Sequence, residues 1–339
     1  MIRVLIVGVG NMGQSHALAH HKSETSEIIG IVNRTGRLLA GGLDKYPRFE
    51  TFEEGLAQNP DLVVIATHSD SHAEFAIRSM ELGADVFVEK PLAPTIQEAE
   101  SVVAAARATR RKLVVGYILR HHPSWMRLIE EARALGGPYV FRMNLNQQST
   151  GAEWEVHKQL MQSTSPLVDC GVHYVDVMCQ IAQSKPISVN GIGLRLSDEI
   201  PDGMYNYGQL QVTFEDGSVG WYEAGWGPMM SETAVFVKDV ISPHGSVSIT
   251  DADRGASAEI EGHTKVGGIL VHRLDGDHFI TLPDEPDHQA LCDAEQAYVL
   301  RVIREGIDLD AHMSDALESL RICIAADESI RKGVPVSLI

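Results

Sequence analysis

The chain has 339 residues, a length that exceeds one ordinary hydrophobic core and suits two domains. Its 28 Lys and Arg stand against 46 Asp and Glu, so the formal net charge is −18. A surface this acidic repels nucleic-acid phosphates and anionic lipid, and we expect neither nucleic acid nor membrane as a partner. The four cysteines form no CxxC pair, no apolar run is long enough for a membrane helix, and the first residues do not resemble a signal peptide. A cytoplasmic location is therefore expected.

From residue 1 to about residue 120, short apolar runs alternate with helical stretches. Nearly continuous apolar runs are typical of parallel strands covered on both faces. Strand–helix–strand alternation therefore predicts an α/β Rossmann domain with a doubly wound parallel sheet over residues 1–120. The expected strands are 3–7, 28–32, 61–67, 85–89 and 112–117, and the expected helices include 14–22, 72–82 and 96–109.

Residues 121–339 have a different pattern, most clearly from about residue 138. Residues 207–214 alternate polar and apolar side chains, turn at Asp216-Gly217 and continue into 218–222, which predicts an antiparallel hairpin. We expect a C-terminal α+β domain with a mostly antiparallel open sheet, whose last helices could pack back on the first domain. Its further strands are expected over 187–196, 234–241, 246–250 and 269–274, and its helices over 166–181, 287–305 and 314–332.

A glycine-rich turn follows the first expected strand and precedes a helix. Its sequence is Gly8-Val9-Gly10-Asn11-Met12-Gly13, the G-x-G-x-x-G fingerprint of dinucleotide-binding domains. Gly8 would permit the tight turn, Gly10 would let the backbone approach a pyrophosphate, and Gly13 would allow close packing of helix and strand. The phosphates would bind free N–H groups at the helix N-terminus, around Asn11 and Met12. A glycine turn without a ligand is the alternative.

The second expected strand ends at Asn33, where NAD-binding domains usually place an acidic residue for the ribose hydroxyls. Without that carboxylate a 2′-phosphate is not repelled, and Arg34 and Arg37 could bind it. The sequence therefore favours NADP as the cofactor. NAD stays open, because both arginines could simply be solvated.

Glu89-Lys90-Pro91 stands at the carboxyl end of an expected parallel strand. Ligands of open α/β sheets bind outside such ends, so Glu89 and Lys90 are expected beside the cofactor. The bond before Pro91 is a candidate cis peptide.

A third group of polar residues lies on the helix expected over 166–181, with Ser165 as its cap. Asp169, His173 and Asp176 would share one face at i, i+4 and i+7, a pattern that suits a tuned acid or base. An ordinary polar helix surface and, more weakly, a metal site are alternatives.

These motifs, in this order, resemble the Gfo/Idh/MocA family of NAD(P)-dependent oxidoreductases. Residues 66–74 are similar to the family's cofactor loop, and residues 314–329 to its C-terminal pattern. The resemblance implies a Rossmann domain, a C-terminal domain for substrate binding and oligomerisation, and a homodimer or homotetramer. It also implies hydride transfer between the cofactor and a ring hydroxyl or ketone of a sugar, cyclitol or related polyol. The cofactor loop would contribute Thr67, His68 and His72.

Carried onto this sequence, the resemblance implies a catalytic group of Lys90, Asp169 and His173. His173 would take the hydroxyl proton, Asp169 would orient His173 or bind a neighbouring hydroxyl, and Lys90 would stabilise alkoxide charge. A polar stretch before the catalytic helix is expected to be a loop that recognises hydroxyl groups, with Trp154 stacking on a sugar face. The expected substrate contacts are Arg120, Asn146, Trp154, His157, Asp169 and His173.

No metal site is expected, because the spacing of the histidines fits no known ligand template. The histidines considered are His20, His21, His68, His72, His121 and His122. Two other functions stay open: an enzyme of this fold that retains its cofactor and processes glycosides, and a dinucleotide-binding regulator without enzymatic activity. A complete proton-transfer group argues against the regulator.

Overall fold

The structure is a computed structural model that describes residues 1–339 apart from 34–38, 40, 232–235, 251–267 and 283–284. The chain divides into two compact units. The first unit comprises Met1–His121 and Pro286–Leu317, and the second comprises His122–Glu285 and Glu318–Ile339.

The first unit contains a six-stranded sheet in the order β3-β2-β1-β4-β5-β6, with parallel pairing at every step. This is the predicted doubly wound Rossmann sheet, so the fold class expected for the first part of the chain is confirmed. Its strands are β1 (Ile2–Val7), β2 (Ser26–Val32), β3 (Arg48–Phe49), β4 (Leu62–Ile65), β5 (Asp85–Glu89) and β6 (Leu113–Gly116).

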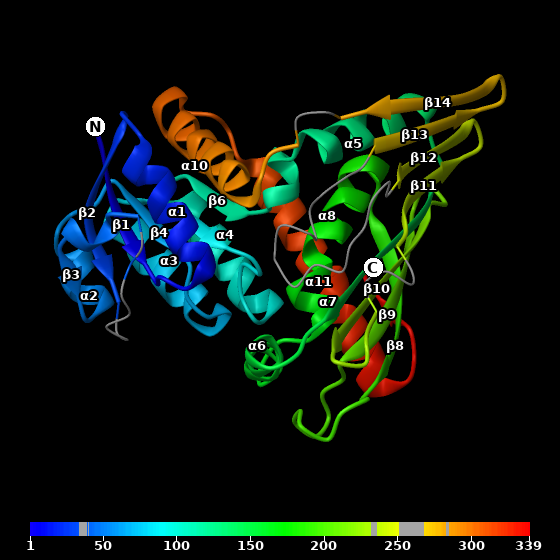
Figure 1. The fold of residues 1–339 in the computed structure, drawn as a ribbon, viewed down its shortest axis with the longest axis horizontal. Coiled ribbons are helices and arrows are strands. Elements are labelled where there is room, and N and C mark those ends of the chain that lie inside the picture. The colour runs from blue at the N-terminus through cyan, green and yellow to red at the C-terminus, as the bar shows by residue number, and fades with distance from the viewer. Residues whose placement is uncertain (34–38, 40, 232–235, 251–267, 283–284) are drawn as a thin grey trace. The chain divides into compact units, whose positions relative to one another are not determined.

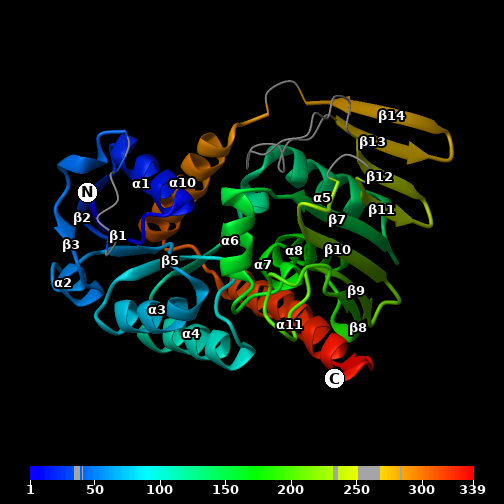
Figure 2. The ribbon, with the colours of Figure 1, turned by 60° about the horizontal axis from the view of Figure 1, so that its bottom comes forward.

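Helices cover both faces of this sheet, as Figures 1 and 2 show. On one face, Val4 and Ile6 share a core with Ala17 of α1 and Val299 of α10. On the other face, α3 packs on β4, β5 and α4. The described helices here are α1 (Asn11–Lys22), α2 (Phe52–Leu56), α3 (His72–Glu81), α4 (Ile96–Thr109), α10 (His288–Glu305), the start of α11 (Asp310–Lys332) and the 3-10 turns η1 (Leu43–Lys45), η2 (Ser69–Ser71) and η3 (Ile118–His121).

The second unit contains a nine-stranded sheet in the order β14-β13-β12-β11-β7-β10-β9-β8-β15. Within this sheet, only the β7–β10 pair is parallel among the described strands, so the expected mostly antiparallel sheet is confirmed. The strands are β7 (Val140–Gln148), β8 (Pro186–Leu194), β9 (Tyr207–Phe214), β10 (Val219–Gly227), β11 (Lys238–Ser242), β12 (Gly245–Thr250), β13 (Gly268–Arg273), β14 (Gly276–Thr281) and β15 (Val336–Ser337).

Helices pack against this sheet and form the core of the second unit (Figure 2). α5 contacts β11, β12 and β13, while α7 and α8 contact β10. The end of α11 reaches β8, where Ser329 Oγ accepts a hydrogen bond of 2.9 Å from the N–H of Gly191. The helices not yet bounded are α5 (Pro123–Leu135), α6 (Ala152–Leu160), α7 (Pro166–Asp169) and α8 (Gly171–Ala182).

Two local predictions for the second unit are wrong. The helix expected over 166–181 is two helices, α7 and α8, that meet at Cys170. Gly171 opens α8 where the chain passes the Tyr222 ring, and a Cβ atom there would lie 3.1 Å from that ring. The polar stretch expected to be a loop is instead the end of β7 followed by α6.

Among the described residues, no helix combines the length and apolar character required to cross a bilayer.

Candidate active site

The glycine-rich turn between β1 and α1 has the backbone geometry that its sequence predicts. Gly8 has a φ of 88°, a conformation that favours glycine. A Cβ atom on Gly13 would overlap the Gly8 carbonyl, so only glycine allows this close packing. A Cβ atom on Gly10 would meet nothing within 4 Å. The open side of the turn is therefore at Gly10, which fits the close approach of a dinucleotide pyrophosphate.

The N-terminus of α1 would complement the charge of a pyrophosphate bound at this turn. The helix begins at Asn11, and no side chain caps it. Asn11 is exposed and Met12 half-buried. Uncapped N–H groups at a helix N-terminus, together with the helix dipole, favour an anion.

The end of β2 holds Asn33, whose N–H donates a 3.0 Å hydrogen bond to the Phe49 carbonyl of β3. No acidic side chain therefore occupies this position. Arg34 and Arg37, which we expect to bind a 2′-phosphate, lie outside the described residues.

The segment after β4 contains the three residues expected in a cofactor loop. The hydroxyls of Thr67 and Ser71 are 2.7 Å apart, and His68 is exposed. His72 is only 1% exposed, and its Nδ1 and Nε2 lie 2.8 and 3.1 Å from the carbonyls of Pro91 and Thr67. The His72 ring therefore joins two loops and leaves almost no surface for the predicted contact with a cofactor. Burial lowers the pKa of His72, while the two carbonyls oppose that shift.

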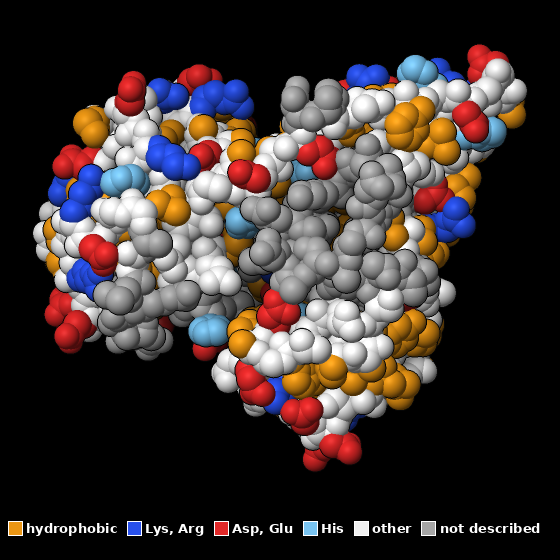
Figure 3. All heavy atoms as spheres, in the orientation of Figure 1, with side chains coloured by type: hydrophobic (Ala, Val, Ile, Leu, Met, Phe, Trp, Pro, Cys, Tyr) orange, Lys and Arg blue, Asp and Glu red, His pale blue; other side chains and the backbone are white. Residues whose placement is uncertain are grey.

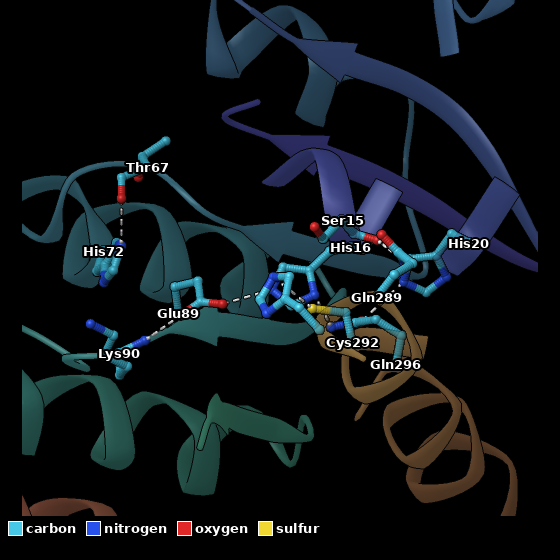
Figure 4. A network of polar contacts seen from close by, with 11 residues as sticks. Ser15, His16, His20, Thr67, His72, Glu89, Lys90, Gln289, Cys292 and Gln296 are labelled. Atoms are coloured by element: carbon cyan, nitrogen blue, oxygen red, sulfur yellow. Dashed lines mark hydrogen bonds and ion pairs between the residues drawn. The ribbon is translucent and has the colours of Figure 1, made fainter. Parts of the chain in front are cut away.

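Lys90 directly follows β5 and is half-buried, and the Lys90–Pro91 peptide bond is cis, as the sequence predicts. The preceding Glu89 carboxylate is buried and binds inside the first unit (Figure 4). Its Oε1 lies 2.6 Å from His16 Nε2, and its Oε2 accepts a 3.1 Å bond from the N–H of Lys90. The Glu89 side chain thus anchors Lys90 from within the protein, although a place beside the cofactor is predicted for it.

In the second unit, Asp169 ends α7 and His173 lies in the first turn of α8. Both side chains are half-buried. The third member of the expected face, Asp176, is buried, and its Oδ2 accepts a 2.9 Å bond from Gln180. Of the three residues on this face, Asp169 and His173 are therefore the two that solvent reaches.

The start of α7 is fixed by two kinds of contact. Ser165 caps the helix, since its Oγ accepts a 3.1 Å bond from the N–H of Val168. The same hydroxyl donates a 2.8 Å bond to Asp327 of α11, and the Tyr205 hydroxyl donates to the same carboxylate. Burial raises the pKa of Asp327. This cluster anchors the segment that carries Asp169.

The other expected substrate residues have varied surroundings. Asn146 on β7 donates a 2.8 Å bond to Glu223 Oε1. The His157 ring stacks on Trp226 at 4.4 Å between centroids, and its Nδ1 lies 2.8 Å from Ser149 Oγ.

Two of the expected substrate residues are engaged in contacts of their own. Trp154 is 5% exposed, and its Nε1 donates a 3.2 Å bond to Glu199. This burial argues against the predicted stacking on a sugar face. In the first unit, Arg120 donates a 2.8 Å bond to Asp315.

Two family models match the chain: "Oxidoreductase family, NAD-binding Rossmann fold" over residues 2–117 and "GFO/IDH/MocA C-terminal domain" over residues 126–236. The chain belongs to the Gfo/Idh/MocA family. It is therefore an oxidoreductase whose first unit is an NAD-binding Rossmann domain. The resemblance stated from the motifs is confirmed.

Several relatives of this Gfo/Idh/MocA chain are named as inositol dehydrogenases. The scyllo-inositol 2-dehydrogenase (NAD(+)) of Bacillus subtilis is 26% identical over 99% of this chain and 96% of that protein. The inositol 2-dehydrogenase of Rubrobacter xylanophilus is also 26% identical, over 66% of this chain and 64% of its own. The structure of myo-inositol 2-dehydrogenase from Lactobacillus plantarum has the same fold, with a TM-score of 0.79, 17% identity and coverage of 100% and 99%.

The buried partners of Glu89 are residues that sequence reasoning missed. His16 lies three positions after Gly13 on α1, but nothing in that spacing indicates a partner on β5. Gln296 contacts His16, and Glu295 lies near Glu89. Both residues come from α10, near the other end of the chain.

Proposed function

We propose that the chain is a nicotinamide-dinucleotide-dependent dehydrogenase acting on a ring hydroxyl of a sugar, cyclitol or related polyol, or reducing the corresponding ketone. The observation that carries the proposal is the position of Lys90, which directly follows β5 of an NAD-binding Rossmann sheet. Ligands of such sheets bind outside the carboxyl ends of the strands. The inositol dehydrogenases among the relatives support a cyclitol or sugar as the substrate.

Each proposed catalytic residue has a distinct role. The bound dinucleotide supplies the hydride acceptor, while the protein supplies orientation and charge. His173 takes the hydroxyl proton as the C–H bond breaks, and Asp169 orients His173 or binds a neighbouring hydroxyl. The Lys90 ammonium stabilises the negative charge that develops on the substrate oxygen. We also propose that Asn146, His157 and Arg120 contact the substrate.

Substitution of Lys90 and His173 tests this proposal. Lys90→Met and His173→Asn are expected to lower kcat by about 100-fold or more, because each removes a charge or proton acceptor used at the reacting oxygen. Dinucleotide binding, followed by nicotinamide fluorescence, is expected to persist in both variants. The control Lys22→Met changes an exposed lysine on α1 that pairs with Asp293 and should leave turnover intact.

The outcomes separate the remaining functions. Unchanged turnover in both variants would overturn the assignment of Lys90 and His173. Dinucleotide that copurifies and is never released in its reduced form would instead indicate the glycoside-processing enzyme with a retained cofactor. Binding without any turnover of polyols or sugars would indicate the regulator.

We further propose that NADP is preferred over NAD. The supporting observation is Asn33 at the end of β2, where no carboxylate is present to repel a 2′-phosphate. Titration of the cofactor-stripped protein with NADPH and NADH measures this preference. Tighter binding of NADH would contradict the proposal and agree with the NAD(+) named for the Bacillus subtilis relative.

A homodimer or homotetramer is proposed through the nine-stranded sheet. Ile192 and Leu194 on β8 and Leu196 just after it are exposed apolar side chains, and Figure 3 shows hydrophobic side chains on the surface of the second unit. Exposed apolar groups on a sheet favour association. Ile192→Asp with Leu194→Asp is expected to lower the mass measured by light scattering, and an unchanged mass would exclude this surface. A cytoplasmic location stays a prediction.

A further inference from the structure

Glu89 lies at the end of a series of side-chain hydrogen bonds, and the side-chain amide of Gln296 fixes their directions. The Nε2 of Gln296 can only donate, so its 3.0 Å contact makes His16 Nδ1 an acceptor. The proton of the neutral His16 ring is then on Nε2, which donates at 2.6 Å to Glu89 Oε1. Glu89 Oε2 accepts from the N–H of Lys90. With donors on both oxygens, Glu89 is ionised.

The other end of the series has the same consistent directions. Gln296 Oε1 can only accept, so His20 Nε2 donates to it at 3.0 Å. His20 Nδ1 then accepts from the Ser26 hydroxyl, also at 3.0 Å. Burial lowers the pKa of His20 to about 4, in agreement with a neutral ring. No cation in this series of side chains therefore offsets the Glu89 carboxylate.

Glu295 of α10 lies beside this series and has no such partners. It is 0% exposed, and among the described residues neither carboxyl oxygen has a hydrogen-bond partner. A carboxyl oxygen of Glu295, a carboxyl oxygen of Glu89 and a ring nitrogen of His16 lie within 4.8 Å of one another. A second carboxylate buried beside Glu89, with a neutral His16, would be repelled and unsolvated.

A metal ion is the other way to satisfy two buried carboxyls and an imidazole. The His16–Glu89 geometry does not favour it. Two ligand atoms on a tetrahedral zinc ion are separated by about 3.3 Å, since each bond is about 2.0–2.2 Å long. The observed separation of 2.6 Å is that of a hydrogen bond.

We propose that Glu89 and Glu295 share one proton, and that the resulting pair with a single negative charge makes Glu89 the positioning residue for Lys90. The proton resides on Glu295, so its neutral carboxyl does not repel the Glu89 carboxylate that lies nearby. Glu89 then keeps both of its bonds, to His16 and to the Lys90 backbone. The positioning part of this inference rests on the proposed catalytic role of Lys90, but the shared proton does not.

The titratable groups around the pair are consistent with one negative charge. Those from other elements are His16 and His20 on α1, His72 on α3 and Lys90 after β5. Cys292 lies on the same helix as Glu295. Burial, followed by the nearby Glu295 and Glu89, raises the pKa of the Cys292 thiol, which is therefore neutral. Burial, followed by Glu89, raises the pKa of Glu295 well above its usual value of 4.5.

Glu295→Gln tests the shared proton, because glutamine has the size of the neutral acid and cannot ionise. The native Glu295 keeps its proton above pH 4.5 while the unfolded chain releases it, so wild-type stability falls as pH rises. The ratio of folding constants, Glu295→Gln over wild type, should therefore grow by up to about tenfold per pH unit above pH 4.5. Denaturant unfolding between pH 4.5 and 8 measures this ratio. The control Glu305→Gln removes an exposed carboxyl at the end of the same helix.

Two results would overturn the shared proton. A ratio that does not change with pH, or a Glu295→Gln variant that is less stable at neutral pH, would show that Glu295 is ionised in the native protein. Elemental analysis of the wild type addresses the metal. If the wild type contains one equivalent of a divalent ion and Glu295→Gln does not, the two carboxyls bind a metal ion and do not share a proton.

The positioning role has a kinetic test of its own. Glu89→Ala releases the Lys90 backbone and is expected to lower kcat by about 100-fold, with smaller changes in substrate KM, because small displacements of a reacting group are this costly. Glu89→Gln keeps one acceptor oxygen and should retain part of the lost rate. Equal kcat in Glu89→Ala and wild type would overturn the positioning role. If the wild type turns over no polyol or sugar, the proposed function fails, while the unfolding experiment still decides the shared proton.

Discussion

The two units hold their share of the proposed catalytic group in different ways. Lys90 follows a strand whose last carboxylate is fixed by buried side chains from α1 and α10. Asp169 and His173 lie where two short helices meet, fixed by the Ser165 cap and by Asp327. The first arrangement is a network of buried side chains from three elements, whereas the second includes a helix cap and the cluster of Ser165, Tyr205 and Asp327. In the first unit the glycine-rich turn between β1 and α1 is also tightly packed at Gly13, so substitutions there should cost more stability than those near α7.

The largest effect is expected at Gly13. Gly13→Ala would force a Cβ atom onto the Gly8 carbonyl, and the backbone cannot retreat as a flexible side chain would. We expect a loss of about 3 kcal/mol in the free energy of unfolding, measured with denaturant.

Gly10→Ala is the matched control in the same loop, because its Cβ atom would meet nothing within 4 Å. Its stability should stay within about 1 kcal/mol of wild type, while a methyl group where a pyrophosphate approaches should weaken dinucleotide binding by more than about tenfold. Equal stability of the two variants would show that the backbone of this turn adapts freely, and would contradict the expectation that substitutions here cost more than those near α7.

A smaller effect is expected at Asp327 in the second unit. Asp327→Ala leaves the hydroxyls of Ser165 and Tyr205 without their acceptor and should cost about 2 kcal/mol of unfolding free energy. Asp327→Asn keeps one acceptor oxygen and should cost less. The half-buried neighbour Glu328 pairs with Lys332 on the helix surface, and Glu328→Ala should change the stability much less than Asp327→Ala.

The pH dependence of Asp327 has a definite sign. Burial raises its pKa above the usual 3.8, so the native state holds the proton more tightly than the unfolded chain. Wild-type stability from this group is therefore lost as pH rises above about 3.8. Asp327→Asn should flatten this decline in denaturant unfolding curves. A decline of equal slope in the two proteins would contradict the raised pKa.

The sequence predicted those features of the fold that neighbouring residues determine. β5 and α4 occur over the expected residues, because continuous apolar runs and the Thr95 cap are local signals. The close approach of Gly171 to the Tyr222 ring could not be predicted, since Tyr222 belongs to a strand far away in the sequence. The sequence does contain a helical signal for α6, because Trp154 and Met161 lie seven residues apart and are both buried. The polar composition of the segment nevertheless indicates a loop.

The same division holds for the candidate site. The glycine positions and Lys90 belong to short motifs with a fixed place in the fold, and the sequence located them. The groups buried around Glu89 come from distant positions: His16 is 73 residues away, and Glu295 lies on a late helix. Only the folded chain brings these groups together, so no spacing in the sequence identifies them.

The smallest effect is expected at His157, where an ordinary packing role and a role in substrate binding can be separated. His157→Phe keeps an aromatic ring to stack on Trp226 but loses the contact with Ser149, whereas His157→Ala loses both. If the polar ring edge binds a hydroxyl, both variants should raise substrate KM by about three- to tenfold with kcat nearly unchanged, because one hydrogen bond is worth about 1 kcal/mol. If the ring only packs, His157→Phe should behave as wild type and His157→Ala should lose about 1 kcal/mol of stability. The comparison of KM with unfolding free energy in these two variants therefore decides whether α6 belongs to the substrate site or to the scaffold of the second unit.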